Sequence, residues 1–267
     1  MQLTLIRNAT LLLEYGGQRL LIDPMLAPQG RYPGFAGTPN AHLANPLVDL
    51  PVPLESLLTV DAVLVTHHHP DHWDEEAKAR LPKQTPVLAQ HEQDRQAILA
   101  AGFNQVALLD GARLGEVQIR TTGGQHGSDL ALAQQGERLG QVCGLLLTHP
   151  DEPSLYLAGD TVWHPAVAQA LDLAPEVVVL NCGEATFNGL GPIIMGAEDV
   201  VRVCRAAPEA QVVAVHLEAL NHCVLSRAEL AAQLAAQGLT DRVMIPADGE
   251  GFCISRTSLG LGVVPLV

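Results

Sequence analysis

The sequence predicts an α/β fold in which sheets lie between helices within one domain spanning residues 1–267. Three short apolar segments open the chain, and the Gly16-Gly17 pair between the second and third is typical of a β-hairpin. From residue 61 onward, strand-like segments alternate with helical ones. No Ser/Gly-rich linker separates the two parts, so the hairpins and the alternating part are expected to form a single layered domain.

The expected strands are short and rich in Leu, Val and Ile. They cover residues 3–6, 10–15, 19–23, 61–66, 86–90, 106–110, 116–122, 142–148, 154–159, 176–181, 211–215, 242–246 and 251–256. Helices are expected between them at 73–80, 91–101, 164–171, 198–206 and 226–238. Ser226 would cap the last helix, because a serine hydroxyl can accept a hydrogen bond from a free backbone N–H of the first turn.

A proline-rich insertion at 24–53 interrupts this pattern. It carries seven prolines, each of which lacks a backbone donor, so it can be neither a helix nor a central strand. A loop of this length in a compact domain is usually functional or disordered. Two interpretations stay open, a surface excursion or a lid over a site. In the second, the loop forms one wall of the pocket and Arg31 contacts the substrate, with Tyr32 and Phe35 covering its apolar part.

Composition and charge exclude several classes of protein. Hydrophobic residues make up 48% of the chain and charged residues 16%, so it can bury a sizeable core. A formal net charge of −14 with two lysines argues against a nucleic-acid partner. Five widely spaced cysteines favour neither a disulfide framework nor a thiolate zinc finger. With no signal peptide and no transmembrane segment recognised, a cytoplasmic location is expected.

The most informative segment follows the expected strand at 61–66 and holds four potential metal ligands: His67, His69, Asp71 and His72. Residues two apart in an extended segment point the same way, so His67 and His69 can share one metal. Pro70 keeps His69 out of the next helix and would place Asp71 at its N-cap, with His72 one step on. His68, at the odd position, should point away from the metal and contact the fold.

Three further candidate ligands each follow an expected strand. His126 comes after 116–122 through a Gly-Gly-Gln turn, Asp160 ends 154–159, and His216 ends 211–215. Loops at the carboxyl ends of strands build the site in layered α/β folds. Imidazole and carboxylate ligands suit zinc, manganese or iron. Asp160 is the natural bridge, because a carboxylate can give one oxygen to each of two cations.

The string His67-x-His69-x-Asp71-His72, followed by a later His, an Asp after a strand and a last His, resembles the metallo-β-lactamase superfamily. The resemblance implies a four-layer αββα sandwich, the metallo-β-lactamase fold, with a dinuclear metal site at one edge. It assigns His67, His69 and His126 to one metal. Asp71, His72 and His216 would hold the second, with Asp160 bridging. Within the superfamily, the chain is most similar to the L-ascorbate-6-phosphate lactonase-like and N-acylphosphatidylethanolamine phospholipase D-like hydrolases. These share the short form of the fold and a Gly-rich turn before the histidine that corresponds to His126.

Several other polar residues leave two interpretations open. His222 is either a cap-supporting histidine or a residue that leans over the metals and contacts substrate or donates a proton. Cys223 is a buried apolar residue or an extra soft ligand. Glu184 is a hydrogen-bonded loop carboxylate or orients a ligand. Asp23 stabilises a turn or supports His67 or His72. Asp248 is expected to stabilise a turn.

Together these residues predict a metal-dependent hydrolase with two divalent ions, Zn²⁺ first and Mn²⁺ or Fe²⁺ as alternatives. A metal-bridging hydroxide would cleave an ester, lactone or phosphoester of a small, anionic molecule. Asp71 would orient the hydroxide and pass a proton to the leaving group, with His222 as the second catalytic candidate. The partner is a small-molecule substrate, and a homo-oligomer is left open. The alternatives are a mononuclear iron dioxygenase of the same fold and a non-catalytic metal-binding regulatory protein.

Overall fold

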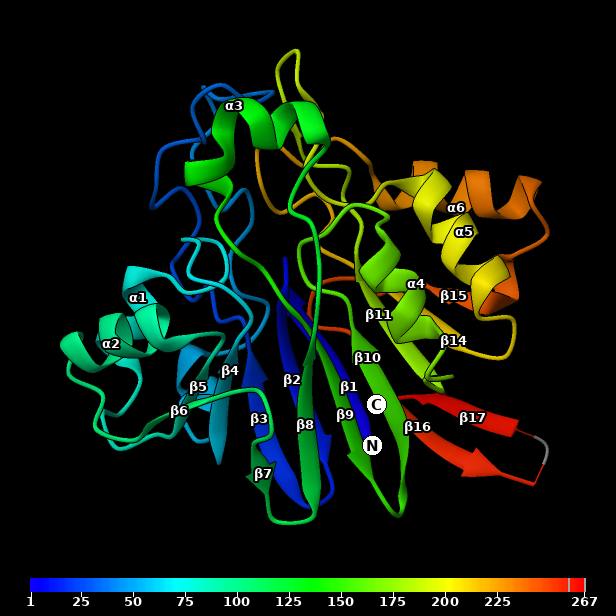
Figure 1. Ribbon diagram of the computed structural model, residues 1–267, viewed down its shortest axis with the longest axis horizontal. Helices are drawn as coiled ribbons and strands as arrows, with labels where there is room; N and C mark the ends of the chain where they lie inside the picture. Colours follow the sequence, from blue (N-terminus) through cyan, green and yellow to red (C-terminus); the bar gives the residue numbers. More distant parts are fainter. Residues whose placement is uncertain (259, 267) are drawn as a thin grey trace.

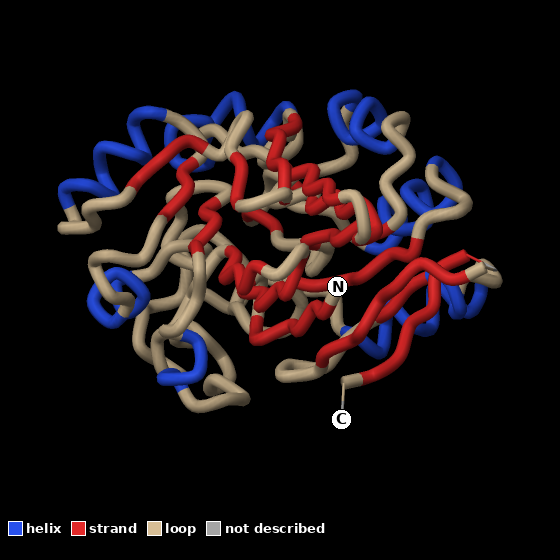
Figure 2. The backbone as a smooth tube through the Cα atoms, turned by 90° about the horizontal axis from the view of Figure 1, so that it is seen from below, coloured by secondary structure: helices blue, strands red, loops and turns tan. Residues whose placement is uncertain are grey.

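Two β-sheets face each other through the centre of the molecule, and helices cover their outer faces (Figure 1). The computed structural model describes residues 1–258 and 260–266. Seen from below, the strands run between helical layers on either side (Figure 2). This arrangement is the expected four-layer αββα sandwich.

The first sheet contains the N-terminal hairpins and the first alternating units. Its strands are β1 Gln2–Arg7, β2 Thr10–Tyr15, β3 Gln18–Ile22, β4 Ala62–Val65, β5 Val87–Ala89, β6 Val106–Leu108, β16 Gly251–Thr257 and β17 Gly260–Pro265. They lie in the order β17-β16-β1-β2-β3-β4-β5-β6. The pairs from β3 to β6 are parallel, so the carboxyl ends of β3 and β4 lie at the same edge.

The second sheet follows in sequence and holds most of the remaining strands. They are β7 Arg113–Leu114, β8 Val117–Thr122, β9 Gly144–His149, β10 Glu152–Leu157, β11 Val177–Asn181, β14 Gln211–Val215 and β15 Val243–Met244. Their order is β15-β14-β11-β10-β9-β8-β7. A separate short hairpin consists of β12 Thr186–Phe187 and β13 Gly191–Pro192.

Six α-helices cover the sheets and one edge of the sandwich. They are α1 Glu75–Arg80, α2 Glu92–Ala100, α3 Asp129–Leu139, α4 Pro165–Leu171, α5 Ala197–Ala206 and α6 Arg227–Ala236, with 3-10 turns at Leu54–Leu57 and Thr240–Arg242. In Figure 1, α1 and α2 lie outside the first sheet, α4 to α6 outside the second, and α3 at the top. Within the described residues, none of these helices combines the length and hydropathy needed to cross a membrane.

Strand alternation explains how the layers are filled. On β2, Leu11 and Leu13 point between the sheets, whereas Leu12 points toward the layer that contains α1 and α2. The inner layer is built mainly from leucines and valines, as the scarcity of aromatic residues requires. Each leucine buried there contributes about 2 kcal/mol relative to an exposed one. Trp73 packs with Phe103 in the outer layer of the first sheet.

The structure corrects three expectations about the elements. Helix α3 was not expected: Ser128 caps it, but only Ala131 and Leu139 are buried, so its sequence shows no clear apolar stripe. The short strands β7, β12 and β13 and the terminal strand β17 were also missed. The N-cap of α1 is Asp74 and not Asp71, because Oδ1 of Asp74 accepts the Ala77 N–H at 2.7 Å.

The proline-rich insertion lies over the same edge of the sandwich as the loops after β4 and β14. Its residues 24–53 form no helix or strand beyond a single bridge between Tyr32 and Asn45. Asn221, which is buried, fixes it: its amide nitrogen donates to Thr38 Oγ1 at 2.9 Å and to the Pro39 carbonyl at 2.7 Å. The insertion is therefore attached to the chain that follows His216.

Candidate metal centre

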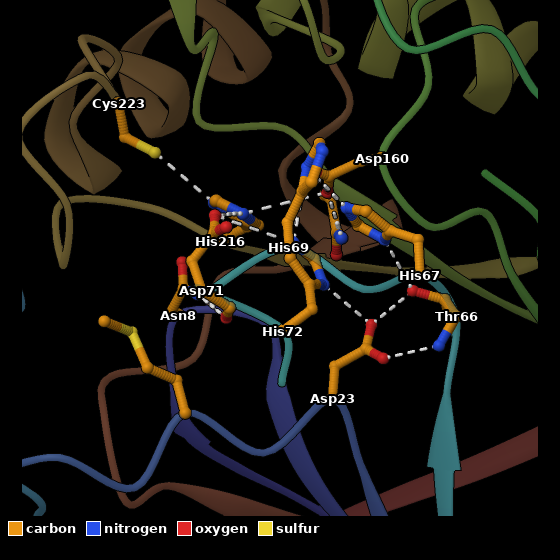
Figure 3. A network of polar contacts seen from close by, with 12 residues as sticks. Asn8, Asp23, Thr66, His67, His69, Asp71, His72, Asp160, His216 and Cys223 are labelled. Carbon is orange, nitrogen blue, oxygen red and sulfur yellow. Dashed lines mark hydrogen bonds and ion pairs between the residues drawn. The ribbon is translucent and has the colours of Figure 1, made fainter. Parts of the chain in front are cut away.

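The seven expected ligands meet at one edge of the sandwich. Figure 3 labels all of them except His126. They come from the loops after four strands, which are β4, β8, β10 and β14. All are buried except His69, which is half-buried. Strand geometry produces the convergence, because the loops leave neighbouring strands of the two facing sheets at the same end.

The first ligand group consists of His67, His69 and His126. One nitrogen from each lies within 4.8 Å of the others. Nε2 of His67 lies only 3.1 Å from Nδ1 of His69. Three imidazole nitrogens at these separations can hold one cation.

The second group consists of Asp71, His72, Asp160 and His216, whose ligand atoms also lie within 4.8 Å of one another. Oδ2 of Asp71 is 3.7 Å from Nε2 of His72 and 3.5 Å from Nε2 of His216. Asp71 therefore lies between two imidazoles and not at a helix terminus. Its main chain is held there by Asn8, whose side chain donates to the Asp71 carbonyl at 2.8 Å.

Asp160 lies between the two groups. Its Oδ2 is 3.9 Å from Nε2 of His67 in the first group and 3.2 Å from Nε2 of His72 in the second. Its Oδ1 is 3.7 Å from Nε2 of His216 and accepts the Asn181 amide at 2.7 Å. This carboxylate can reach both positions, as a bridging ligand must.

Each histidine of the centre has its other ring nitrogen occupied by a group behind it. For His67 and His72 the partners are Thr66 Oγ1 at 3.0 Å and Asp23 Oδ2 at 2.8 Å. The remaining pairs are His69 with the Arg138 carbonyl at 3.0 Å, His126 with the Ile193 carbonyl at 2.8 Å, and His216 with Cys223 Sγ at 3.3 Å. Such outer contacts fix ring orientation and tautomer, so the inward nitrogens are His69 Nδ1 and Nε2 of the other four.

Three residues at the centre have an unfavourable backbone conformation. Asn8, Asp23 and His216 all have positive φ values, of 59°, 46° and 64°. This conformation is unfavourable for residues with a Cβ and persists where the surroundings impose it. Here the His216 N–H donates to the Asn8 carbonyl at 2.9 Å and the Asp23 N–H to the Leu64 carbonyl at 2.9 Å.

The charges within the centre perturb one another strongly. Burial alone would lower the pKa of His72, but the carboxylates of Asp160 and Asp71 outweigh it and raise this pKa to about 10. Burial, reinforced by the neighbouring imidazoles, holds the pKa of His67 well below its usual range. Burial would raise the pKa of Asp160, but His72 and His216 hold it well below the usual value. The two carboxylates are therefore ionised beside nitrogen ligands, and a divalent cation would displace protons on binding.

The donor set fits divalent cations. Nε2 of His72 and Nε2 of His216 are buried within the described parts of the chain and face the carboxylate oxygens of Asp71 and Asp160 at 3.2 to 3.7 Å, but neither makes a hydrogen bond of good geometry. Unpaired buried nitrogens are costly unless a ligand satisfies them. Two carboxylates and five imidazoles suit zinc, manganese or iron. His67, His69 and His126 would hold one ion, and Asp71, His72 and His216 the other, with Asp160 between them.

A cavity of about 270 Å³ opens onto the centre. Its lining is mainly apolar and aromatic and consists of Phe35, Thr38, His69, Pro70, Asp71, His126, Arg138, Leu139, Asp160, Phe187, Ile193 and His222. Phe35 and Thr38 belong to the proline-rich insertion, which supplies the wall that the sequence analysis expected. Arg31 is exposed and does not line this cavity, and the Tyr32 hydroxyl donates to Asp74 at 3.3 Å instead.

Sequence reasoning missed Arg138, the one Lys or Arg side chain among the described residues that line the cavity. It lies on α3, whose weak periodicity hid the helix. It also missed Asn8, Thr66 and Asn181, which hold the ligands from behind. Asn8 follows a strand directly in the sequence, but nothing in the sequence indicates that its side chain reaches Asp71.

The other candidates have distinct places. His222 is buried, lines the cavity and packs edge-on against Phe35, with ring centroids 4.7 Å apart. Burial lowers the pKa of His222 to about 4. Cys223 lies behind His216 and not among the ligands (Figure 3). Glu184 lies beside Gly196 at the start of α5 and outside the cavity lining.

Three remaining expectations can be compared with the structure. Asp23 was expected either to stabilise a turn or to support His67 or His72, and the structure shows that it supports His72. His68 points away from the centre, and its Nδ1 lies 3.6 Å from Asp94 on α2, as expected. Asp248 lies in a turn and also accepts a hydrogen bond from Arg227 at 2.7 Å.

The two facing sheets and the His/Asp centre define a protein of the metallo-β-lactamase fold. Residues 2–216 match the family model described as the beta-lactamase superfamily domain, and the chain belongs to this family. It is 42% identical over 259 residues to the UPF0173 protein YddR of Bacillus subtilis (strain 168). The alignment covers 94% of this chain and 99% of the relative.

Two solved structures are similar over nearly the whole chain. One is isothiocyanate hydrolase from Delia radicum gut bacteria, with a TM-score of 0.93, 48% identity and coverage of 96% of this chain and 100% of the other. The other is a possible metal-dependent hydrolase from Veillonella parvula DSM 2008, with a TM-score of 0.92, 38% identity and coverage of 94% and 98%.

A more distant relative agrees with the expected branch of the superfamily. The N-acyl-phosphatidylethanolamine-hydrolyzing phospholipase D of Saccharomyces cerevisiae is 23% identical over 215 residues. The match covers 76% of this chain and 44% of that protein.

Proposed function

We propose that this chain, a metal-dependent hydrolase of the metallo-β-lactamase fold, hydrolyses small neutral electrophiles with an apolar substituent, and isothiocyanates in particular. The observation that carries the proposal is the apolar cavity that opens onto both ligand groups. An isothiocyanate, R–N=C=S, has a linear electrophilic head and carries its bulk on nitrogen. The head would face Asp71 and Asp160, and the apolar substituent would lie against Phe35, Leu139 and Phe187.

The similarity to isothiocyanate hydrolase supports this choice of substrate. That protein is 48% identical and aligns over its whole length. An uncharged substrate also agrees with the lining, in which the guanidinium of Arg138 is already engaged by the Ala36 carbonyl at 2.8 Å. A strongly anionic substrate would need further cationic partners.

Two divalent cations, Zn²⁺ first and Mn²⁺ or Fe²⁺ next, are the proposed cofactors. When bound, they would lower the pKa of a water shared between them, so that hydroxide is available near neutral pH, and would polarise the electrophile. The separation into two ligand groups with Asp160 between them supports two ions rather than one. A mononuclear iron dioxygenase would need only one of these groups.

The proposed reaction consumes one water per substrate. The hydroxide oxygen bonds to the central carbon, the electrons of the C=N bond move to nitrogen, and nitrogen takes up the proton to give a thiocarbamate. After a second proton transfer to nitrogen, the C–N bond breaks and releases an amine, R–NH₂, and carbonyl sulfide. Asp71 lines the cavity and is ionised, so it can accept the proton of the water and deliver it to nitrogen.

His222 is proposed to orient the substrate. Its imidazole is neutral at pH 7, because burial lowers its pKa to about 4. Its Nδ1 is buried and has no partner among the described residues. A neutral imidazole carries one N–H donor and one acceptor nitrogen, so it can hydrogen-bond the nitrogen or sulfur of the substrate.

Esters and lactones are the second candidate substrates. Their carbonyl carbon undergoes the same attack, and the apolar cavity would hold an acyl chain. The distant similarity to a phospholipid-hydrolysing enzyme points the same way. Phosphoesters are less well supported, because the cavity offers no second arginine or lysine among its described lining residues.

The test is hydrolysis by the purified, metal-loaded protein. Ethyl isothiocyanate, an ethyl ester, a lactone and a phosphodiester are compared by measuring the amine, acid or alcohol released. We expect amine and carbonyl sulfide from the isothiocyanate in equal amounts, lost in Asp71→Asn and kept in Asp94→Asn, whose carboxylate contacts His68 outside the centre. Turnover of the ester or phosphodiester with no isothiocyanate hydrolysis above the buffer rate would overturn the proposal.

A further inference from the structure

We propose that Arg138 is a specificity-determining residue, which closes the mouth of the cavity and limits the length of the substituent that fits. This inference rests on the proposed function. Arg138 is exposed at the C-terminal end of α3, lines the cavity, and joins two segments that are far apart in the sequence.

The first of these segments is the proline-rich insertion. Nη1 of Arg138 donates to the Ala36 carbonyl at 2.8 Å. Ala36 directly follows Phe35, which lines the cavity and packs on His222. A contact that holds Ala36 in place therefore also holds the aromatic wall.

The second segment is the β12–β13 hairpin. Cζ of Arg138 lies 4.8 Å from the centroid of the Phe187 ring, which is within the range of a cation–π contact. The same hairpin contacts the insertion directly, because the Asn188 N–H donates to the Gly37 carbonyl at 2.9 Å. Arg138, Ala36 and Phe187 thus form a closed set of contacts across the mouth, which we call the mouth clasp.

The backbone of Arg138 has a separate task. Its carbonyl accepts the hydrogen bond of His69 Nε2 at 3.0 Å and orients this ligand. Because a side-chain substitution leaves the carbonyl in place, the mouth clasp can be removed without removing the support of His69. The effect on substrates can therefore be separated from the effect on metals.

Without the guanidinium, the backbone bond at Gly37 would remain as the direct hydrogen bond between the insertion and the hairpin within the described part of the chain. The wall carrying Phe35 would move outward more readily, and the cavity would accept longer substituents while holding short ones less tightly. Loss of one hydrogen bond and one exposed cation–π contact corresponds to about a tenfold weakening of the closed state.

The experiment compares Arg138→Ala, Arg138→Lys and the control Arg120→Ala in the metal-loaded protein. Arg120 is an exposed arginine on β8 that does not line the cavity. The substrates are ethyl and hexyl isothiocyanate, and hydrogen–deuterium exchange of residues 33–40 is measured in parallel. For Arg138→Ala we expect KM for the ethyl compound to rise about tenfold with kcat nearly unchanged. The hexyl-to-ethyl ratio of kcat/KM should rise about fivefold or more, and exchange should accelerate about tenfold.

Arg138→Lys keeps the charge but not the planar fork, so it should restore part of each effect. Metal content should equal that of the wild type in all three variants. Unchanged KM, unchanged substrate ratio and unchanged exchange in Arg138→Ala would overturn the inference. If the wild type hydrolyses esters and not isothiocyanates, the proposed substrate fails separately. The same comparison with ethyl and hexyl esters then decides the role of Arg138.

Discussion

Oδ2 of Asp23 lies 2.8 Å from Nδ1 of His72, so a carboxylate at the end of one strand orients a candidate metal ligand that follows the next strand. The same carboxylate also accepts hydrogen bonds from the N–H of Thr66 at 2.7 Å and from its hydroxyl at 2.6 Å. Asp23 thereby connects β3 to the loop after β4. A buried carboxylate with three partners of this kind holds the ring of His72 in one orientation.

Asp23→Asn should weaken metal binding without unfolding the protein. An amide has a single acceptor oxygen, so it cannot accept the three hydrogen bonds from Thr66 and His72 that the carboxylate accepts, and its NH₂ group would face one of these donors. The ring of His72 would therefore lose its fixed orientation and the nearby negative charge that supports its basicity. We expect affinity for the more weakly held of the two ions to fall about 10- to 100-fold, measured by competition with a chromogenic chelator. Asp94→Asn is the matched control, because Asp94 contacts His68, which points away from the metals. Equal affinities in Asp23→Asn and wild type would contradict this role.

His222→Phe should lower kcat and leave both metals bound. Phenylalanine keeps the edge-on packing against Phe35 but removes both ring nitrogens. Loss of a positioned hydrogen-bonding group costs about 100-fold in kcat. Metal content is measured by elemental analysis beside the kinetics, and His42→Phe, at an exposed position of the insertion, is the control. A variant with wild-type kcat would assign His222 to packing alone.

Asn221→Ala should loosen the wall of the cavity. The Asn221 side chain accepts from Asn45 Nδ2 at 2.8 Å and from the Phe35 N–H at 3.0 Å, besides its two donated bonds to residues 38 and 39. Removing it leaves several buried groups unpaired, which should cost about 3 kcal/mol of unfolding free energy. Urea unfolding measures the loss. The control is Asn188→Ala: Asn188 is exposed, and its backbone N–H, which the substitution keeps, donates to the insertion. This variant should change the unfolding free energy by less than about 0.5 kcal/mol.

Stability should depend on pH through Glu176, far from the metals. Hydrogen bonds from Arg256 at 2.7 Å are the main cause that lowers the pKa of Glu176 to about 2. Because the pKa of Glu176 is lower in the folded state than in the unfolded state, the ionised side chain stabilises the fold fully above about pH 5. This contribution to the unfolding free energy is lost as the pH falls toward 2. Glu176→Gln should cost about 1 kcal/mol at pH 7, discounted for partial exposure, and progressively less below pH 4.5. Urea unfolding of both proteins from pH 7 to 3.5 checks this. A difference in unfolding free energy between the two proteins that stays constant or grows on acidification would contradict this role of Glu176.

Much of the fold could be predicted because local patterns agree with the tertiary structure. In β2, Leu11, Leu13 and Tyr15 are buried and Glu14 is exposed, as the alternating pattern predicts. The wholly apolar strand before His67 is buried along its whole length, as its sequence predicts. Helix α3 could not be predicted, because Gly136 and a non-helical Gln135 lie inside it and only two of its residues are buried. Tertiary contacts hold this segment in place: Ala131 and Leu139 pack against Phe187 and Ile193, and Arg138 contacts Ala36 and Phe187.

That the candidate ligands lie together could be predicted from their positions at strand ends, whereas the residues behind them could not. Asn8, in the turn after β1, contacts Asp71, and Asn181, at the end of β11, contacts Asp160. No spacing in the sequence indicates either contact. The expectation that Arg31 lies in the cavity was wrong, because Arg31 is exposed and does not line it. The arginine that lines the cavity is Arg138 on α3. The cytoplasmic location, the homo-oligomer and the single-domain boundary stay predictions.

The central claim is that two divalent ions held by His67, His69, Asp71, His72, His126, Asp160 and His216 are required for hydrolysis. The most direct test is to strip the protein with a chelator, restore Zn²⁺ or Mn²⁺ stepwise, and measure amine release from ethyl isothiocyanate at each step. We expect no turnover without metal and a maximum at two equivalents per chain. Full turnover in the stripped protein, or a maximum at one equivalent with no further rise, would contradict the account.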